Sequence, residues 1–401
     1  MCRNPQTEIG TSHMTNSIVN TAGAAISSTP TLIRNKKWVL ARRPVGLFSL
    51  DDVTLQTDSI LTEKAPSSVS NGIIEDSPDD LSPTQILVKV QMLSVDAFIR
   101  TMLDEEAYHG SIGIGDVVPA IGYGTVVAVG SSVTSQKVGS VVSGLLGAQL
   151  YAKLESKEAF QNIVARLLPS TPTLSLGLLS LTTGLTAYVG IFKVTKPPGR
   201  KDTVVVSAAS GAVGSVAVQL AKNVCKSKRV VGIAGGPVKC AYLMEELHLD
   251  GCVDYKHPKK SVAEQLAEFC PEGIDFFYDN VGGEVLDACL DCINPKGRVV
   301  ICGAISQYSG NLNKGSVQGP SSYLKLAERG AIMVGFNVMQ HMLSLPVGMV
   351  SMLWWYFRGI VSLQEHVEPS IASFPLALQK LFTGGHIGKM LVNVEAVAPS
   401  N

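Results

Sequence analysis

A run of β-branched residues that leads into a small-residue turn constrains this chain more than any other feature. Residues 204–214 read VVVSAASGAVG, and the stretch that follows has apolar residues at helical spacing. Ala209, Gly211 and Gly214 occupy the three positions of a G-x-G-x-x-G turn whose first glycine is an alanine. Small residues let the backbone approach a pyrophosphate, and N–H groups at the helix start bind the anion. The segment predicts a dinucleotide-binding turn, although similar turns occur in folds without a ligand.

The next strand indicates which dinucleotide is favoured. In NAD-selective folds an acidic residue near the end of this strand holds the ribose hydroxyls, but the segment RVVGIAGG ends in Ala234, Gly235 and Gly236. No carboxylate is there to repel a 2′-phosphate, and Lys239 follows in the first turn of the next helix. The pattern therefore favours NADP(H) over NAD. The alternative is that Lys239 is an ordinary solvated helix residue.

Charge and cysteine content exclude several classes of protein. Lys plus Arg and Asp plus Glu both total 33, so no basic field is present to hold nucleic acid. Of eight cysteines, Cys289 and Cys292 have C-x-x-C spacing, but no second pair or nearby histidine completes a zinc site. We interpret both as small buried helix residues and predict no metal. Cysteines within apolar stretches suit a reducing compartment.

The chain divides into a β-rich part and an alternating part. Residues 1–35 are rich in Ser, Thr and Asn, which predicts a disordered tail without a secretory signal. We expect a cytoplasmic protein, although Arg3 and Arg34 leave an organellar transit peptide open. Residues 58–83 are polar and turn-rich and predict a mobile surface insertion. From about Leu174, helical and strand-like stretches alternate, which predicts an α/β fold with a doubly wound parallel sheet.

One stretch near the C-terminus is unusually apolar. Met342–Phe357 contains 16 apolar or small residues, short of the roughly 20 that a membrane-spanning helix needs. A buried or subunit-facing helix is therefore favoured over membrane contact through Trp354, Trp355 and Tyr356.

Six motifs occur in one order along the chain: AASGAVGS, GIAGGPVKC, DYK, YDNVGGE, RVVICGAISQY and GKMLVNV. With them the chain resembles the zinc-independent medium-chain dehydrogenase/reductase superfamily, specifically the NADP-dependent alkenal/one oxidoreductases that include the prostaglandin and leukotriene B4 reductases. The resemblance implies a GroES-like β-rich domain at residues 36–172 and a Rossmann domain that binds NADP(H) at 173–340. Residues 341–401 would complete the first domain. Members are commonly homodimers.

The resemblance also implies where the cofactor binds. The glycine turn would hold the pyrophosphate, two residues the 2′-phosphate end, and three later segments the nicotinamide half. The implied cofactor residues are Gly211, Ala212, Val213 and Gly214, then Lys239 and Tyr255, then Asn280, Cys302, Gly303, Ala304, Ser306, Phe336, Asn337 and Val338. For Asn280 the alternative is a turn residue that caps the end of a strand.

The implied reaction needs no metal. Zinc alcohol dehydrogenases of the same superfamily carry a Gly-His-Glu motif, whereas the corresponding place here reads Gly122-Tyr123-Gly124, so alcohol oxidation loses its Lewis acid. The resemblance implies NADPH-dependent reduction of the C=C bond of an α,β-unsaturated ketone or aldehyde. Hydride goes to the β-carbon, and the resulting enolate is stabilised by the catalytic Tyr308 and a ribose hydroxyl of the cofactor. The alternative for Tyr308 is a loop tyrosine with a solvated hydroxyl.

Two departures from the family pattern concern the substrate and the cofactor. The family's DPYMR reads DAFIR here, which keeps Arg100 as a substrate residue but replaces a tyrosine by Phe98 and predicts a more apolar pocket. The family's Asn-x-Gly-Lys reads His386-Ile-Gly-Lys, which leaves open whether residue 386 contacts the cofactor.

Two other functions remain open at this point. A quinone oxidoreductase would use the same cofactor site without a dedicated proton donor. From a different class, the chain could be a non-catalytic NADPH-binding or membrane-adaptor protein, an option that the apolar stretch 342–357 keeps open.

Overall fold

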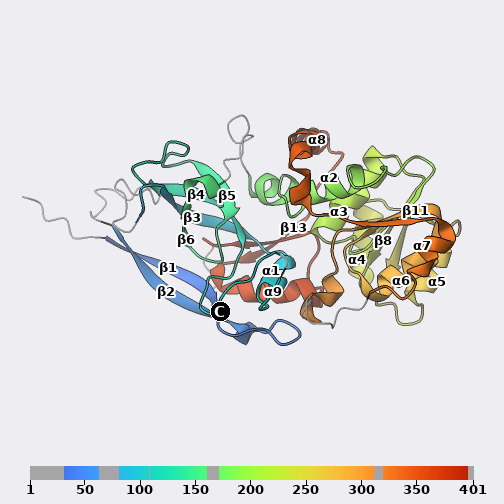
Figure 1. Ribbon diagram of the computed structural model, residues 1–401, viewed down its shortest axis with the longest axis horizontal. Helices are drawn as coiled ribbons and strands as arrows, with labels where there is room; N and C mark the ends of the chain where they lie inside the picture. Colours follow the sequence, from blue (N-terminus) through green and yellow to red (C-terminus); the bar gives the residue numbers. More distant parts are fainter. Residues whose placement is uncertain (1–30, 63–80, 108, 160–170, 311–318, 396–401) are drawn as a thin grey trace, which may run out of the picture.

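The computed structural model describes residues 31–62, 81–107, 109–159, 171–310 and 319–395. Figure 1 shows an elongated molecule with a β-rich half that contains both ends of the described chain and a half in which helices flank a sheet. The described strands form two six-stranded sheets and one two-stranded ribbon.

The sheet that carries the predicted dinucleotide turn is parallel throughout. Its strand order is β12-β11-β10-β7-β8-β9, and all five pairings are parallel. The chain starts in the middle of this sheet with β7, adds β8 and β9 on one side, and then adds β10, β11 and β12 on the other. In open sheets of this kind, ligands bind beyond the carboxyl ends of the strands at such a switch point. The predicted doubly wound sheet is confirmed. The strands are β7 (Thr203–Val206), β8 (Arg229–Ala234), β9 (Gly251–Asp254), β10 (Ile274–Asp279), β11 (Ile293–Ile301) and β12 (Ile332–Gly335).

Helices cover both faces of this sheet, which explains its continuously apolar strands. Val204 and Val206 pack on one face, and Val205 between them packs on the other. In Figure 1, α2, α3 and α8 lie above the sheet and α5 and α6 below it. The helices are α2 (Gly184–Phe192), α3 (Ala212–Gln219), α4 (Pro237–Ala241), α5 (Val262–Phe269), α6 (Gly283–Asp291), α7 (Leu324–Arg329) and α8 (Leu345–Phe357).

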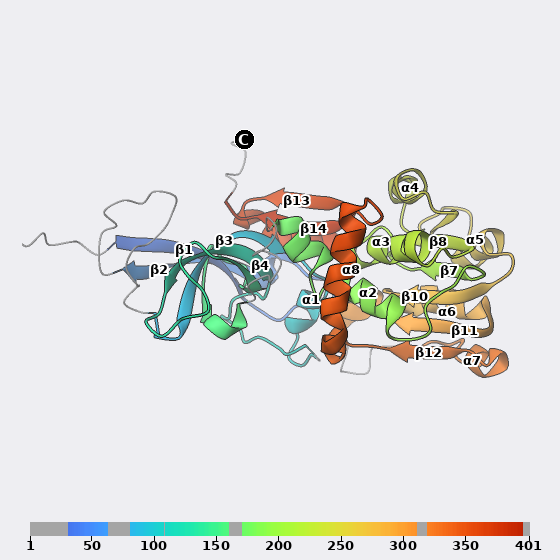
Figure 2. The same ribbon diagram turned by 90° about the horizontal axis from the view of Figure 1, so that it is seen from above.

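The second sheet joins strands from the two ends of the described chain. Its order is β13-β14-β3-β4-β5, with β6 also paired to β3, and β14 runs antiparallel to β3. Figure 2 shows β13 and β14 beside β3 and β4, with α8 crossing the junction between the two halves. The strands are β3 (Gln85–Ser94), β4 (Ile121–Val129), β5 (Val141–Leu145), β6 (Tyr151–Glu155), β13 (Glu365–Pro369) and β14 (Lys389–Asn393), and the helices of this half are α1 (Phe98–Met102) and α9 (Phe374–Thr383).

The two-stranded ribbon corrects two predicted boundaries. Strand β1 (Thr31–Leu40) begins inside the predicted tail, and β2 (Val53–Thr62) ends inside the predicted insertion. The strands pair without a break from Thr31 to Leu40, so backbone hydrogen bonds extend the strands past the point where the side-chain pattern becomes polar. The remaining predicted tail, 1–30, and insertion residues 63–80 lie outside the described residues, and the domain boundaries at 172 and 340 stay predictions.

A glycine joins the two halves at the dinucleotide turn. Gly388, just before β14, forms an isolated bridge with Gly211, and its N–H donates to the Ser210 carbonyl at 2.8 Å. Its φ is +73°, and a Cβ there would lie 1.9 Å from the Gln364 carbonyl oxygen, so only glycine fits. The C-terminal segment is therefore fastened directly to the turn.

The apolar stretch 342–357 forms the end of the 3-10 helix η8 (Val338–Ser344) and all of α8. One face of α8 packs inward, with the Trp355 ring next to Tyr188 and Phe192. The opposite face is exposed, and Trp354 keeps 59% of its surface accessible. In the part of the chain that is described, no helix is long and apolar enough to cross a bilayer.

Candidate active site

The dinucleotide turn leaves backbone N–H groups available to an anion. Helix α3 begins at Ala212, with Gly211 as its N-cap and no side chain capping it. A Cβ at Gly214 would lie 2.2 Å from the Ala208 carbonyl oxygen, so glycine is required for the helix to pack this closely on the strand. Uncapped N–H groups at a helix start bind phosphate well. The contacts predicted for Gly211, Ala212, Val213 and Gly214 stay predictions that this geometry favours.

The alanine in the first position of the turn has a structural explanation. Ala209 is fully buried, and its N–H donates to the Ile233 carbonyl at 3.0 Å. Its methyl group lies 2.8 Å from where a Cβ of Gly232 would be. The missing side chain of Gly232 in the neighbouring strand thus makes room for the methyl group of Ala209.

Two lysines converge where the cofactor's 2′-phosphate is expected. The Nζ atoms of Lys239 on α4 and of Lys256 after β9 both lie 3.6 Å from the Cβ position of Gly384. No carboxylate pairs with Lys239 among the described residues. Tyr255 is half exposed, and its ring lies 2.6 Å from where a Cβ of Gly235 would be. Of the two residues predicted for this end, Tyr255 contacts Gly235 just after β8, and Lys239 lies on the helix that follows.

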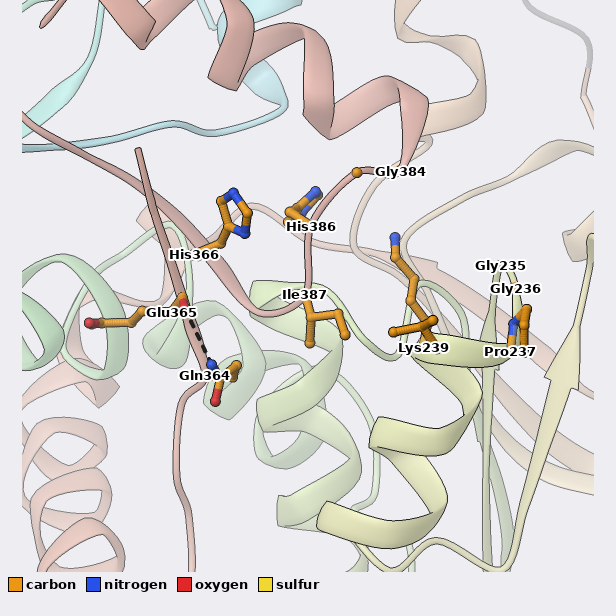
Figure 3. Close-up of a pocket in the computed structure, with 12 residues that line it drawn as sticks. Gly235, Gly236, Pro237, Lys239, Gln364, Glu365, His366, Gly384, His386 and Ile387 are labelled. Carbon is orange, nitrogen blue, oxygen red and sulfur yellow. Dashed lines mark hydrogen bonds between the residues drawn. The ribbon is translucent and has the colours of Figure 1, made fainter. Parts of the chain in front are cut away.

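A cavity of about 390 Å³ separates α4 from the C-terminal segment. Figure 3 shows the Lys239 side chain extending toward Gly384, with the His386 and His366 rings on the far side of the opening. His386 is the residue whose contact with the cofactor the sequence left open, and the structure places it in the same cavity as Lys239. Sequence reasoning missed Lys256 and His366, because nothing along the chain indicates that they meet Lys239.

Electrostatics in this cavity favour an anionic ligand. Burial and the nearby Lys256 amine lower the pKa of Lys239. Burial and Lys239 lower the pKa of His386 to about 4, and the buried Nδ1 of His386 has no hydrogen-bond partner among the described residues. A phosphate group would offset the repulsion between the lysines and accept hydrogen bonds. These residues therefore fit the phosphorylated ribose of NADP(H).

A buried carboxylate organises the ends of β7 and β10 at the switch point. Asp279 is fully buried and accepts hydrogen bonds from the Ser207 hydroxyl at 2.7 Å and from the N–H groups of Val281 and Gly282. Burial raises its pKa. The Asn280 amide donates to the Ser207 carbonyl at 2.7 Å, so it bridges the two strand ends. This is the capping role weighed as its alternative, and its cofactor contact stays a prediction.

The loop predicted to line the nicotinamide half is held by hydrogen bonds to the end of β10 and the residues that follow it. The Cys302 N–H donates to the Asp279 carbonyl at 2.7 Å, and the Ser306 hydroxyl to the Val281 carbonyl at 2.6 Å. Gly303, Ala304 and the 3-10 helix η7 (Ile305–Gly310), which carries Tyr308, complete the loop.

Tyr308 lies beneath this loop. It is 8% exposed, and its hydroxyl accepts a hydrogen bond from the Ala304 N–H at 3.3 Å. A Cβ at Gly303 would lie 2.8 Å from that hydroxyl, so glycine permits the approach. The solvated hydroxyl considered as the alternative is not what the structure has. The catalytic role of Tyr308 stays a prediction.

The segment after β12 borders the same loop region in the predicted site. Asn337 caps η8, because its Oδ1 accepts from the Met339 N–H at 2.9 Å. Phe336 and Val338 are half-buried against the core that contains Tyr278 and α8. Cofactor contacts of all three residues stay predictions.

The two predicted substrate residues have different surroundings. Helix α1, which contains both, contacts η7 and so brings Phe98 near the Tyr308 segment from the other half of the molecule. Arg100 is only 1% exposed and donates to Asp104 at 2.7 Å and to the Gly46 carbonyl at 2.7 Å. Its Nε has no hydrogen-bond partner among the described residues, and the substrate contact predicted for Arg100 stays a prediction.

A second buried ion pair supports the base of α1. Lys389 at the start of β14 is 1% exposed, and its Nζ lies 2.6 Å from Oδ1 of Asp96, which also accepts from the Ser94 hydroxyl. The sequence offered one signal for it, a lysine that opens the otherwise apolar strand KMLVN. Elsewhere in the described ranges, no three His, Cys, Asp or Glu side chains are grouped to hold a metal ion.

Two protein-family models match the chain. Residues 36–162 match the N-terminal domain of oxidoreductase, and residues 212–346 match a model described as zinc-binding dehydrogenase. The first match lies within the β-rich half, and the second covers most of the half with the parallel sheet, from α3 to the start of α8.

Individual proteins match nearly the whole chain. NADPH-dependent curcumin reductase of Escherichia coli is 31% identical over 90% of this chain and 97% of its own length. The NADP-dependent 2-alkenal reductase of Nicotiana tabacum is 32% identical over 77% and 87%. The crystal structure of CurA from Vibrio vulnificus in complex with NADPH is 30% identical and covers 90% of this chain and 100% of its own, with a TM-score of 0.76. The chain belongs to the medium-chain dehydrogenase/reductase superfamily, in the family of NADP-dependent alkenal/one oxidoreductases that its motifs predicted.

Proposed function

We propose that this protein is an enzyme that uses NADPH to reduce the C=C bond of α,β-unsaturated ketones and aldehydes. The observation that carries the proposal is the approach of the Lys239 and Lys256 amines to Gly384 at the edge of the cavity, with no carboxylate paired to either lysine among the described residues, together with the uncapped start of α3. An NADPH-dependent curcumin reductase and a 2-alkenal reductase among the relatives support the same reaction.

Residues at one end of the proposed cleft bind the phosphates of the cofactor, and residues at the other end surround the reacting atoms. NADPH, when bound, supplies a hydride to the β-carbon of the substrate. The lysines and the start of α3 bind its phosphates, and the glycines at 211, 214 and 235 let the backbone come close. Asn280 and the loop 302–306 shape the other end. Tyr308 would hold negative charge that develops on the carbonyl oxygen, after a turn of its side chain away from the Ala304 N–H.

The substrate end favours an apolar molecule. Phe98 packs with its ring 5.2 Å from that of His109, and the charged Arg100 and Asp96 close to it each form an ion pair within the protein. A substrate gains little from charge there, because both charges are already paired. Medium-chain enones and aromatic enones fit this environment, and the experiment is a panel of such carbonyls tested for NADPH consumption.

The role of Tyr308 separates enone reduction from the quinone oxidoreductase alternative. In Tyr308→Phe, we expect kcat for an enone to fall by about 100-fold, the usual size of a lost proton-transfer or oxyanion contact. Reduction of a para-quinone, which needs no such donor, should change much less. The substitution removes the hydroxyl and keeps the ring that packs beneath the loop, so melting temperature serves as the folding control. Equal losses for both substrates, or none, would remove Tyr308 from the reaction.

We also propose a homodimer that covers the exposed face of η8 and α8. Seven apolar side chains lie at least 47% exposed there, and exposed apolar patches often mark protein–protein contacts. They are Met339, Met342, Leu343, Val347, Val350, Trp354 and Phe357.

Light scattering on the purified protein tests the homodimer. Val350→Glu should yield monomers, while Val45→Glu, at another highly exposed position in the other half, should leave dimers. A wild-type monomer that floats with liposomes would replace the dimer by the membrane alternative. We place the protein in the cytoplasm, a proposal supported by its free cysteines in the described segments and tested by fractionation of expressing cells.

A further inference from the structure

Two cysteines meet beside the cofactor cavity. Cys240 lies on α4 directly after Lys239, and Cys252 lies on β9 three residues before Tyr255. Their sulfur atoms are 2.7 Å apart, against about 2.05 Å in a disulfide. A movement of about 0.7 Å would therefore bring the two sulfurs to bonding distance. The spacing of twelve residues gave no sign of this pair in the sequence.

The two thiols are not equivalent. The Cys252 thiol donates to the Cys240 sulfur, which lowers the pKa of Cys240 and raises that of Cys252. Of the seven cysteines that the structure describes, Cys240 alone has a lowered pKa, and burial raises that of Cys225 to about 11. Cys240 is half-buried, so a small reagent has access to it. A thiolate is the reactive form of cysteine, which makes Cys240 the nucleophile of the pair.

We propose that Cys240 and Cys252 are a redox-active pair that a peroxide oxidises to an intramolecular disulfide. The Cys240 thiolate attacks one peroxide oxygen, the O–O bond breaks, and Cys240 becomes a sulfenic acid as hydroxide leaves. The Cys252 sulfur then attacks the Cys240 sulfur, and the departing hydroxyl takes the Cys252 proton as water. Two thiols are oxidised, one peroxide is reduced to two waters, and a thiol reductant reverses the change.

The disulfide would fasten together the two elements that supply the 2′-phosphate contacts. Helix α4 carries Lys239, and β9 leads into Tyr255 and Lys256. A hydrogen bond already joins the two elements before oxidation, because the Gly236 N–H at the start of α4 donates to Asp254 at the end of β9 at 2.7 Å. Only the link to cofactor binding rests on the proposed function. The oxidation chemistry stands on the geometry of the pair.

Peroxide treatment of the full-length protein followed by alkylation and peptide mass spectrometry tests the pair. We expect a cross-linked Cys240–Cys252 peptide that is about 2 Da lighter than the two thiols together, since two hydrogens are lost, and that disappears with dithiothreitol. Cys240 should be oxidised at least about tenfold faster than Cys225. Cys240→Ser should abolish the cross-link, whereas Cys225→Ser, a matched change at another half-buried cysteine, should leave it intact. No cross-link in the wild type, or equal rates at Cys240 and Cys225, would overturn the proposal.

Two further measurements on the same samples separate this proposal from the enzyme activity. Hydrogen exchange at residues 238–241 should slow in the oxidised protein, and unchanged exchange would overturn the fastening of α4. NADPH binding is followed by fluorescence on the reduced protein. A protein that forms the disulfide but never binds NADPH would contradict the proposed function and leave the cysteine pair standing.

Discussion

The two ends of the cleft differ in whether their charged side chains are paired within the protein. Near the substrate end, Arg100 pairs with Asp104 and Lys389 with Asp96, each within 2.7 Å and almost completely buried. Near the 2′-phosphate end, Lys239 and Lys256 approach each other, and His386 is held neutral beside them. At the first end each charge is paired within the protein, whereas the two lysines at the other end have no carboxylate partner among the described residues.

This difference shows how one cleft can combine a fixed cofactor preference with an open choice of substrate. Unpaired cations give a phosphorylated cofactor a large share of its affinity, because the ligand offsets repulsion that the free protein must carry. Internally paired charges add rigidity but leave the substrate to be held by shape and apolar contact. Removing charges at the two ends should therefore have different consequences.

The largest effect is expected from breaking the internal ion pair at the substrate end. Lys389→Met leaves Asp96 buried without its cation, which should lower the free energy of unfolding by about 3–5 kcal/mol. Urea denaturation measures the loss. Lys325→Met, which breaks an exposed pair with Glu328, is the control and should cost no more than about 1 kcal/mol. A loss as small as the control would show that the pair does not hold the site.

At the other end, removal of a lysine should affect binding and leave the fold intact. Lys239→Ala should weaken NADPH binding by about 1.5–3 kcal/mol, the value of a charge-assisted contact, and leave NADH binding unchanged. Its melting temperature without cofactor should not fall, because the repulsion from Lys256 disappears. Titration calorimetry with both cofactors makes the comparison. Lys259→Ala, an exposed lysine outside the cavity, is the control, and equal losses for NADPH and NADH would remove Lys239 from the phosphate site.

The cationic end should also make stability depend on pH. His386 has a pKa of about 4 in the folded protein, lowered from 6.5 by burial first and by Lys239, with His366 and Lys389 as further neighbours. Below pH 6.5 the His386 side chain is protonated in the unfolded chain, whereas in the folded protein it stays neutral down to about pH 4. The free energy of unfolding therefore falls as the pH drops from 6.5 toward 4.

Urea midpoints at about pH 7 and pH 5 quantify this dependence. The wild type should lose roughly 1–2 kcal/mol more than His386→Asn between these two values. Equal losses in the two proteins would mean that His386 titrates normally.

The smallest effect is expected at the apolar substrate end. Phe98→Tyr restores the hydroxyl that the family pattern has at this position. We expect KM for an apolar enone to change by roughly threefold or less, with NADPH affinity unchanged, because a half-buried ring can turn its hydroxyl toward solvent. Steady-state kinetics with each ligand varied in turn checks it. An altered affinity for NADPH would place Phe98 in the cofactor site instead.

The sequence predicted elements whose signals are local and missed contacts that only the fold creates. The strand and turn at 203–214 were predictable, because β-branched residues and small residues each restrict the backbone directly. The lysine that opens the strand KMLVN is a local signal, but its partner Asp96 lies 293 residues away, and no local pattern indicates which residue it pairs with. The same holds for the convergence of Lys256, His366 and His386 on Lys239. The ion pair of Arg100 with Asp104 at i+4 was likewise not predicted, although the two residues lie close along the chain.

Calorimetric titration of the wild-type protein with NADPH and NADH tests the central claim most directly. The unpaired lysines predict that NADPH binds at least about tenfold more tightly than NADH, and that 2′,5′-ADP competes with it whereas 5′-ADP does not. Equal affinity for the two cofactors, or no competition by the 2′-phosphate, would contradict the claim that this end of the cleft is built for an anion.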